Sequence, residues 1–406
     1  MALRESLSSR PAWASRRVII AGAAAVALAA GGTATALAAH SAGHHSLAGK
    51  PAAAKARLAS SICTGPAGSA YLALPGYQAF DAFDTSDCSL VQQYNVGDPI
   101  VPGTQIPGND NEQDFNYSST NEGVALSNGT LYFADTGNDT LAVVPTADLT
   151  VANYANPTET LVHVGINPQG VAVTPDGTQA WVADTGPQTG GPSLGGIDVV
   201  STTTDTVTAT LRLHSDPREI AFSPDGSTAY VTTGRGLLVI DTATLQVTAQ
   251  IRGLGDPQDV VVSPDGSTVY VTNTIQGEVD VISAATDTVT DAIQVGELPW
   301  QEVLSSDGST LYVADGDSNE VSVISTATDT VTGSIPVTGD PVSVALTPDG
   351  SELWVGGLTT GLLTVFDTSN DSTVASFTVG YGGEANDGLG EEPTSIVFTT
   401  APPPGG

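Results

Sequence analysis

The fold is decided by residues 255–273, which read GDPQDVVVSPDGSTVYVTN, and by their continuation VDVISAATDTVT at 279–290. Four short runs rich in Val, Ile, Tyr and Thr are separated here by turn residues, so one copy of this stretch predicts four strands. Its Asp-Gly turn recurs along the chain at steps of 40 to 49 residues. A period near 40 residues with strand-rich content is typical of propeller blades and not of helical solenoids.

The number of copies predicts a closed ring. The second-strand run occurs seven times between residues 70 and 355, and the first-strand run occurs seven times between 123 and 400. The strands at 69–97 lack a preceding first strand, whereas the run at 393–400 has no strands after it, so the two fragments complete one blade. We therefore expect an all-β, seven-bladed propeller of four-stranded blades over residues 61–400, with one blade closed by the C-terminal strand.

One copy carries a family signature. Residues Tyr270-Val271-Thr272-Asn273 match the name motif of the YVTN family of β-propeller repeats, and the recurrent Ser-Pro-Asp-Gly segment fits the same family. The chain resembles this family from about residue 69 to residue 400. The resemblance implies a bacterial propeller that is exported and that serves as a scaffold or a binding surface, because most such propellers have those roles.

The N-terminus has the pattern of an export signal. Arg16 and Arg17 precede an apolar run at 18–39, which resembles a twin-arginine signal, although a general secretory signal fits as well. Ala36-Leu37-Ala38 is a candidate cleavage site. The run is also long enough to remain as a membrane anchor, so the protein is expected outside the cell, either secreted or attached to the surface. The predicted organisation is a signal or anchor (1–38), a flexible linker (39–60), the propeller (61–400) and a disordered tail (401–406).

The charge of the chain is strongly negative, with 44 acidic and 11 basic residues. After residue 57 only four arginines remain, and there is no lysine. This surface excludes nucleic acid as a partner, and membrane association would require an uncleaved N-terminal segment. The excess of acids either keeps a secreted monomer soluble or binds cations or a basic partner.

The only two cysteines, Cys63 and Cys88, are predicted to form a disulfide. Cys63 precedes the split blade and Cys88 lies in a turn within it. In an exported protein this bond would hold the incoming segment on the closing blade.

The loops that lead into the first strand of each blade share one face with the loops between the second and third strands. That face collects Asp135, Asp184, Asn273 and Asp315. At the mouth of each first strand, one position points toward the axis. Its acids, Glu122, Glu219 and Asp259, together with Gln301, form a candidate Ca²⁺ site, because Ca²⁺ prefers oxygen ligands. A hydrated acidic funnel is the alternative. The full set at this position is Glu122, Gly170, Glu219, Asp259, Gln301, Ser343 and Ser395.

Other departures from the repeat lie on the same face. Trp300 lies in a lead-in loop, where its ring would either stack on a sugar or peptide or pack against a neighbouring loop. Two acidic insertions, at 98–120 and 380–392, are expected to reach this side and form a lid.

No catalytic motif stands out, so the sequence favours an acidic ligand-binding scaffold for a protein, peptide or carbohydrate. Propellers of similar appearance include metal-dependent streptogramin lyases and lactonases. In that alternative Glu122, Glu219, Asp259 and Gln301 would be ligands, with His214 as an acid or base. The absence of a histidine cluster counts against the lyase type. A third alternative is an adhesion or matrix component, which would need the uncleaved anchor.

Overall fold

The structure is a computed structural model that describes residues 69–74, 79–84, 89–95, 123–136, 138–149, 159–186, 195–379 and 395–399. All of them fall in one compact unit, Ala54–Gly406. This part of the chain is almost entirely strand, as the short β-branched runs between turn residues predict. Its one helical element is the 3₁₀ turn η2 (Thr146–Asp148). No helix within these residues is long and apolar enough to cross a membrane.

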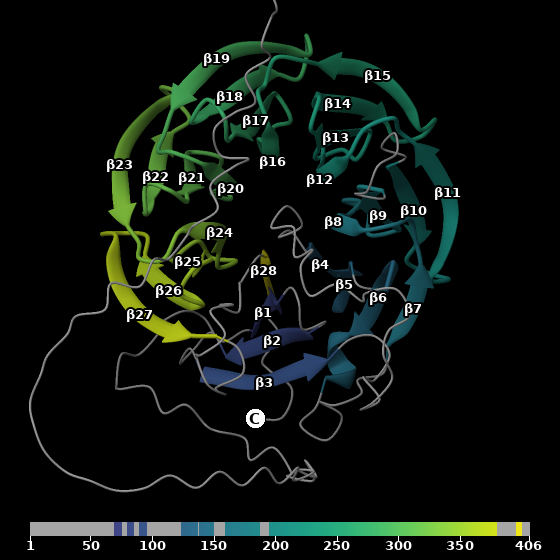
Figure 1. Cartoon of the computed structure of the whole chain (residues 1–406), viewed down its shortest axis with the longest axis horizontal. Helices are drawn as coiled ribbons and strands as arrows, with labels where there is room; N and C mark the ends of the chain where they lie inside the picture. The colour runs from purple at the N-terminus through teal and green to yellow at the C-terminus, as the bar shows by residue number, and fades with distance from the viewer. Residues whose placement is uncertain are drawn as a thin grey trace, which may run out of the picture. The chain divides into compact units, whose positions relative to one another are not determined.

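The strands form seven antiparallel four-stranded sheets around a common axis (Figure 1). Each innermost strand contacts the innermost strands of both neighbouring blades, so the ring is closed. The predicted fold is confirmed, including the split blade. Blade 1, from the axis outward, consists of β28 (Ser395–Thr399), β1 (Ser69–Leu74), β2 (Ala79–Asp84) and β3 (Ser89–Asn95).

The other six blades are continuous in sequence, and each runs outward from its first strand. Blades 2 to 4 are β4 (Val124–Ser127), β5 (Thr130–Asp135), β6 (Thr140–Pro145) and β7 (Thr160–His163); β8 (Pro168–Val173), β9 (Gln179–Asp184), β10 (Gly196–Ser201) and β11 (Thr206–Arg212); and β12 (Pro217–Phe222), β13 (Thr228–Thr233), β14 (Gly236–Asp241) and β15 (Gln246–Ile251). Blades 5 to 7 are β16 (Pro257–Val262), β17 (Thr268–Asn273), β18 (Glu278–Ser283) and β19 (Thr288–Gln294); β20 (Pro299–Leu304), β21 (Thr310–Asp315), β22 (Glu320–Ser325) and β23 (Thr330–Pro336); and β24 (Pro341–Leu346), β25 (Glu352–Gly357), β26 (Leu362–Asp367) and β27 (Ser372–Thr378).

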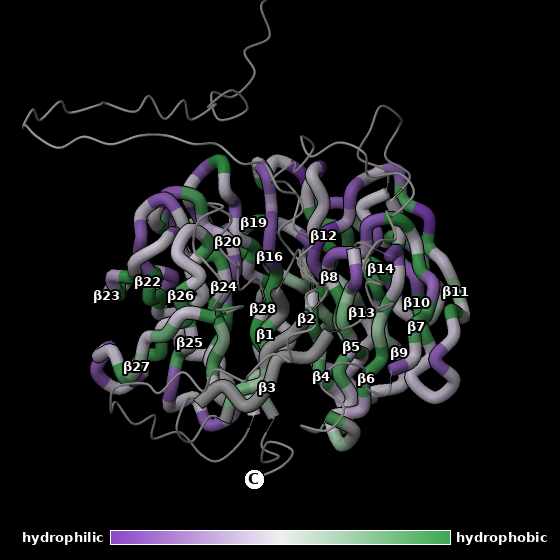
Figure 2. The backbone as a smooth tube through the Cα atoms, turned by 60° about the horizontal axis from the view of Figure 1, so that its bottom comes forward, coloured by the Kyte–Doolittle hydropathy of each residue, from purple (hydrophilic) through white to green (hydrophobic). Residues whose placement is uncertain are grey.

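The core lies between blades. Each of seven hydrophobic clusters draws its residues from two neighbouring blades. Successive strand residues face opposite sides of a blade, so Val271 packs against blade 4 and Tyr270 against blade 6. Apolar residues therefore run along the strands, whereas hydrophilic residues gather in the loops at the strand ends (Figure 2).

The junction between blades 7 and 1 is rich in aromatic rings. Trp354 meets Phe83, Phe377 and Phe398 at centroid distances of 6.1, 6.1 and 5.4 Å, each edge to face. This geometry is favourable for aromatic pairs beyond the apolar area that they bury. The cluster joins the N-terminal and C-terminal parts of the ring, since Phe398 belongs to β28 and Phe83 to β2.

The Asp-Gly turns stabilise the hairpin between the first two strands of a blade, as expected. In blade 5, Asp265 Oδ1 accepts hydrogen bonds from the Ser263 hydroxyl at 2.7 Å and from the Ser267 amide and hydroxyl at 3.0 and 2.8 Å. These bonds lower the pKa of Asp265 to about 2. Gly266 follows with φ +72°, a conformation that favours glycine. The repeated Asp is therefore structural.

Candidate functional site

The candidate site begins with a bulge at the mouth of the innermost strands. In blades 4, 5 and 6, the first residue of the strand is a proline that pairs with the end of the second strand, and pairing resumes only three residues later. Two residues per blade are left out of the ladder, and a bulge of this kind redirects side chains. The bulged pairs are Arg218-Glu219, Gln258-Asp259 and Trp300-Gln301.

A threonine of the second strand secures each carboxylate-bearing bulge. Thr272 Oγ1 accepts the amide of Asp259 at 2.9 Å and donates to the carbonyl of Trp300 in the next blade at 2.7 Å. Thr232 holds the amide of Glu219 in the same way at 3.0 Å. The hydroxyl is fully buried in both cases. The bulge is thus fixed to its own blade and to its neighbour, which positions Glu219 and Asp259 firmly.

The Asp259 carboxylate is turned toward the next innermost strand. Its Oδ1 accepts the amide of Val260, and its Oδ2 accepts the amide of Glu302 in blade 6, both at 2.8 Å. Burial raises the pKa of Asp259 to about 6, and the two amides oppose that rise because they stabilise the ionised form. Asp259 is therefore mostly ionised at neutral pH.

Glu219 interacts electrostatically with Asp259. Burial and the negative charge of Asp259 raise the pKa of Glu219 to about 8, so Glu219 mostly holds its proton at neutral pH. Both residues are only partly exposed. Two neighbouring carboxyl groups with separated pKa values can act as an acid and a base in one reaction. The structure thus brings two of the predicted residues together.

A third carboxyl group, Glu302, lies near the pair and was not predicted from the sequence. Its side chain is 4% exposed, and neither carboxyl oxygen has a hydrogen-bond partner. Burial, followed by the charges of Asp259 and Asp280, raises its pKa well above the usual value. The sequence does indicate Glu302, because an acid stands there at the position directly after the axial one. Every other innermost strand carries an aliphatic residue there: Val124, Val171, Ile220, Val260, Val344 and Ile396.

The other predicted site residues have different surroundings. Gln301 lies in the bulge of blade 6 and is half-buried. The ring of Trp300 lies over Gly316, where an added Cβ would be 3.1 Å from the indole. This agrees with the packing alternative for Trp300. Glu122 lies outside the described residues, and strand register makes the next residue, Gly123, the equivalent of Gly170.

The four polar residues assigned to the loops between second and third strands are buried, and each is the last residue of its second strand. Asp184 is 3% exposed, and its neighbours in this role, Asp135, Asn273 and Asp315, are fully buried. Burial and the charge of Asp198 raise the pKa of Asp184 to about 8. A backbone amide of the preceding lead-in loop, at Gly165, bonds to Asp184, so this side chain anchors a loop.

A metal site is not assembled by the described residues, since no three of their His, Cys, Asp and Glu side chains are grouped closely enough to hold an ion. Glu219 and Asp259 supply only two of the predicted oxygen ligands. The predicted disulfide of Cys63 and Cys88 and the insertions at 98–120 and 380–392 lie outside the described residues.

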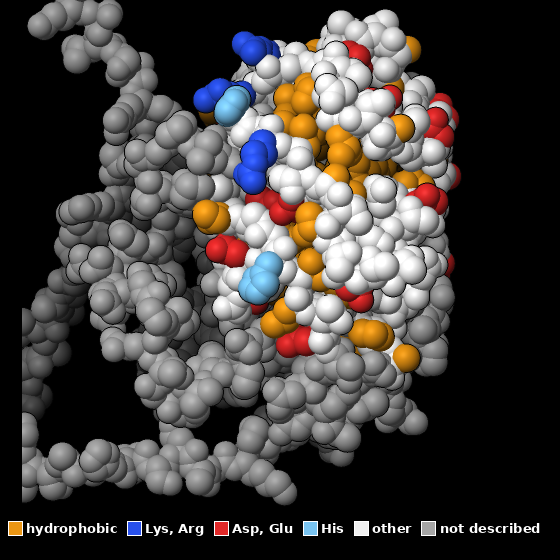
Figure 3. All heavy atoms as spheres, turned by 90° about the vertical axis from the view of Figure 1, so that its right-hand side faces the viewer, with side chains coloured by type: hydrophobic (Ala, Val, Ile, Leu, Met, Phe, Trp, Pro, Cys, Tyr) orange, Lys and Arg blue, Asp and Glu red, His pale blue; other side chains and the backbone are white. Residues whose placement is uncertain are grey.

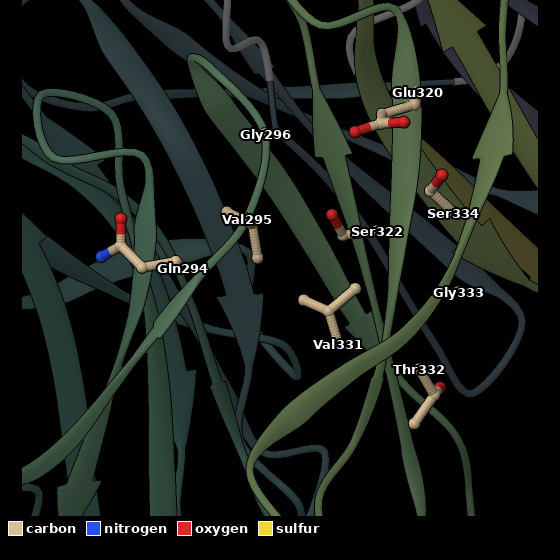
Figure 4. Close-up of a pocket in the computed structure, with 9 residues that line it drawn as sticks. All are labelled: Gln294, Val295, Gly296, Glu320, Ser322, Val331, Thr332, Gly333 and Ser334. Atoms are coloured by element: carbon tan, nitrogen blue, oxygen red, sulfur yellow. The ribbon is translucent and has the colours of Figure 1, made fainter.

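A separate hollow lies away from the axis. A groove of about 470 Å³ runs between Gln294 and the outer strands of blade 6, where Glu320 and Ser334 line it (Figure 4). It contains none of the predicted site residues. The predicted residues Glu219 and Asp259 therefore lie at the bulges near the axis and not in this groove.

Comparisons with known proteins agree with the fold. The family model described as "Lactonase, 7-bladed beta-propeller" matches residues 171–345, a range that contains Glu219, Asp259 and Glu302. No curated protein matches the chain.

Solved structures with the same fold have low sequence identity. Hydrazine synthase of Kuenenia stuttgartiensis is 22% identical with a TM-score of 0.57, covering 72% of this chain and 92% of that chain. A functionally unknown protein from Desulfotomaculum acetoxidans is 18% identical, with a TM-score of 0.61 and coverages of 83% and 99%. The dihydro-heme d1 dehydrogenase NirN is 12% identical, with a TM-score of 0.55 and coverages of 82% and 75%. The chain is a seven-bladed β-propeller that is similar to the lactonase propellers over residues 171–345.

Proposed function

We propose that the protein is a lactonase-type hydrolase that opens a lactone ring at Glu219 and Asp259. The observation that carries the proposal is the pair itself: two neighbouring carboxyl groups, fixed by bulges, with pKa values of about 8 and about 6. The match of residues 171–345 to the lactonase propeller family supports the choice of substrate class.

The pair can divide the work of hydrolysis. Ionised Asp259 takes a proton from a water molecule, whose oxygen attacks the lactone carbonyl. Protonated Glu219 gives its proton to the ring oxygen as the carbon–oxygen bond breaks. The product is a hydroxy acid, and a proton passes from Asp259 to Glu219 to restore the starting state. The backbone of Glu302 positions the base Asp259, because the Glu302 backbone amide donates a hydrogen bond to Asp259 Oδ2 at 2.8 Å.

The calcium ligands that the sequence predicted remain a prediction. Carboxylate oxygens suit Ca²⁺, but the described residues bring only Glu219 and Asp259 together, and no three acids are grouped. No step is therefore assigned to a metal. Each hydrolysis assay is run with CaCl₂ and with EDTA, which measures any metal requirement directly.

The test is the pH profile of hydrolysis on a panel of γ- and δ-lactones, followed by acid release. The proposal predicts a bell-shaped rate with limbs near pH 6 and pH 8, because Asp259 must be ionised and Glu219 protonated. Glu219→Gln should remove the limb near pH 8 and Asp259→Asn the limb near pH 6, with losses of about 10²-fold or more in rate. Glu320→Gln, an acid on the outer groove, is the matched control.

Two results would contradict the proposal. One is the absence of ring opening on any lactone above the buffer rate, and the other is unchanged activity in both variants of the pair. Saturable binding of a lactone without turnover would instead favour the ligand-binding scaffold that the sequence predicted.

A further inference from the structure

A second charged feature lies on the rim of blade 4. The four arginines of the described residues fall within 41 positions of one another, between Arg212 and Arg252. On the side of the ring that carries β11, basic side chains gather in one area of the surface (Figure 3). In a chain with 44 acidic and 11 basic residues, such a concentration of positive charge in one sector is a marked departure.

Most of this positive charge lacks an acidic partner. Ion pairs are recorded for Arg218 alone among the described arginines; it lies 2.9 Å from Asp256 and 3.8 Å from Asp216. Asp216 and Asp256, the two acids of the lead-in loops in this region, thus both pair with Arg218. Arg235 and Arg252 are exposed and form no ion pair within the described part of the chain. A nearby anion would therefore meet available donors.

Arg235 and Arg252 converge on one hollow of about 170 Å³. Arg235 comes from the turn between β13 and β14, and Arg252 follows β15. Arg252 donates its Nε and Nη2 to the side-chain oxygen of Gln250 at 3.1 and 2.7 Å, which holds the guanidinium in one orientation and leaves other N–H groups free. The hollow is lined by Leu213, His214, Ser215, Arg235, Leu238, Val247, Gln250 and Arg252.

The lining suits a small oxyanion. Leu213 and Leu238 are buried and give the hollow an apolar floor, near which electrostatic attraction is stronger than in water. His214 adds an imidazole that can donate a hydrogen bond. At about 170 Å³ the hollow is below the size of pockets for drug-sized ligands, which begin at about 300 Å³. A tetrahedral group with several acceptor oxygens matches both the size and the donors.

We propose that His214, Arg235 and Arg252 form a binding site for a phosphate- or sulfate-type oxyanion, separate from the carboxylate pair at the axis. The guanidinium groups supply charge-assisted hydrogen bonds, and each good bond of this kind contributes appreciably to affinity. The ligand is either a free inorganic ion or the phosphate group of a larger molecule.

The experiment is isothermal titration of the full chain with sodium sulfate, sodium phosphate and phenyl phosphate, with ionic strength held constant by NaCl. Wild type should show saturable binding. The double variant Arg235→Gln/Arg252→Gln should weaken it at least tenfold. Arg212→Gln removes the same charge from an exposed arginine that does not line the hollow, and it should change affinity less than twofold.

The outcomes separate the possibilities. Tighter binding of phenyl phosphate than of phosphate identifies a phosphorylated molecule as the ligand, whereas the reverse identifies the free ion. Absence of saturable binding in wild type overturns the proposal. So does a loss of affinity in Arg212→Gln as large as that in the double variant, because the anion would then respond to the overall positive charge and not to a defined site. Glu219→Gln should bind the anion normally, so failure at the axis and failure here are distinguishable.

Discussion

Replacing Glu302 by valine should make the propeller more stable. Glu302 occupies a position of the innermost strand that is aliphatic in the other six blades, and it is 4% exposed. Its two carboxyl oxygens lack partners, and leaving a buried polar group unpaired costs about 1–3 kcal/mol. Valine is smaller, and the space it leaves costs about 1 kcal/mol. The net gain in the free energy of unfolding should be about 0–2 kcal/mol.

The gain should depend on pH. Burial raises the pKa of Glu302 in the folded state, so above its ordinary value of 4.5 the folded state holds a proton that the unfolded state has released. The wild type is therefore penalised increasingly as pH rises from about 4.5. The variant lacks this group, so its advantage should be larger at pH 8 than at pH 4.5.

Urea unfolding followed by circular dichroism at pH 4.5 and pH 8 measures both effects. Glu302→Gln is the control, since it keeps polar atoms in place but removes the ionisation, and it should lose the pH dependence alone. Val344→Glu is the reciprocal change and should destabilise blade 7. A lower urea midpoint for Glu302→Val at both pH values would refute this prediction, and so would an equal effect at both.

Three further predictions concern the whole ring. Stability should fall between pH 5 and pH 8, because folded Asp184 and Glu219, with pKa values of about 8, bind protons that the unfolded chain has released; a urea midpoint that rises over this range contradicts it. Gly170→Ala should destabilise by about 1–3 kcal/mol or more, since its Cβ would lie 2.1 Å from the Arg218 carbonyl oxygen, whereas Gly333→Ala, with nothing within 4 Å, should not. If the predicted calcium site exists, CaCl₂ should raise the melting temperature and EDTA lower it; no change in either removes that prediction.

The repeat made the fold predictable because its turn residues, its strand residues and its period all indicate the same structure. Asp265-Gly266 specifies a turn, Tyr270 and Val271 specify a strand covered on both sides, and the period specifies a blade. The split blade followed from counting strands. These inferences need only local backbone and burial rules, which a single sequence carries.

The candidate site was predictable only in part. Glu219 and Asp259 stood out because they follow a proline at a repeated position. The interaction between them depends on how closely neighbouring innermost strands approach. The packing of Trp300 depends on the missing side chain at Gly316, which is distant in sequence. Glu302 was not predicted because only the axial position was compared between blades. Glu302 lies one residue later, at a position that is aliphatic in the other six blades.

The split blade also sets the order in which the protein can be completed during synthesis. β28 (Ser395–Thr399) provides the innermost strand of blade 1, yet it is synthesised after all the strands of the other six blades, whereas its neighbour β1 precedes them. Until then Tyr71 lacks its partner Val397, and the ring of aromatic side chains around Trp354 lacks Phe398. The ring can thus close only after every blade has been synthesised.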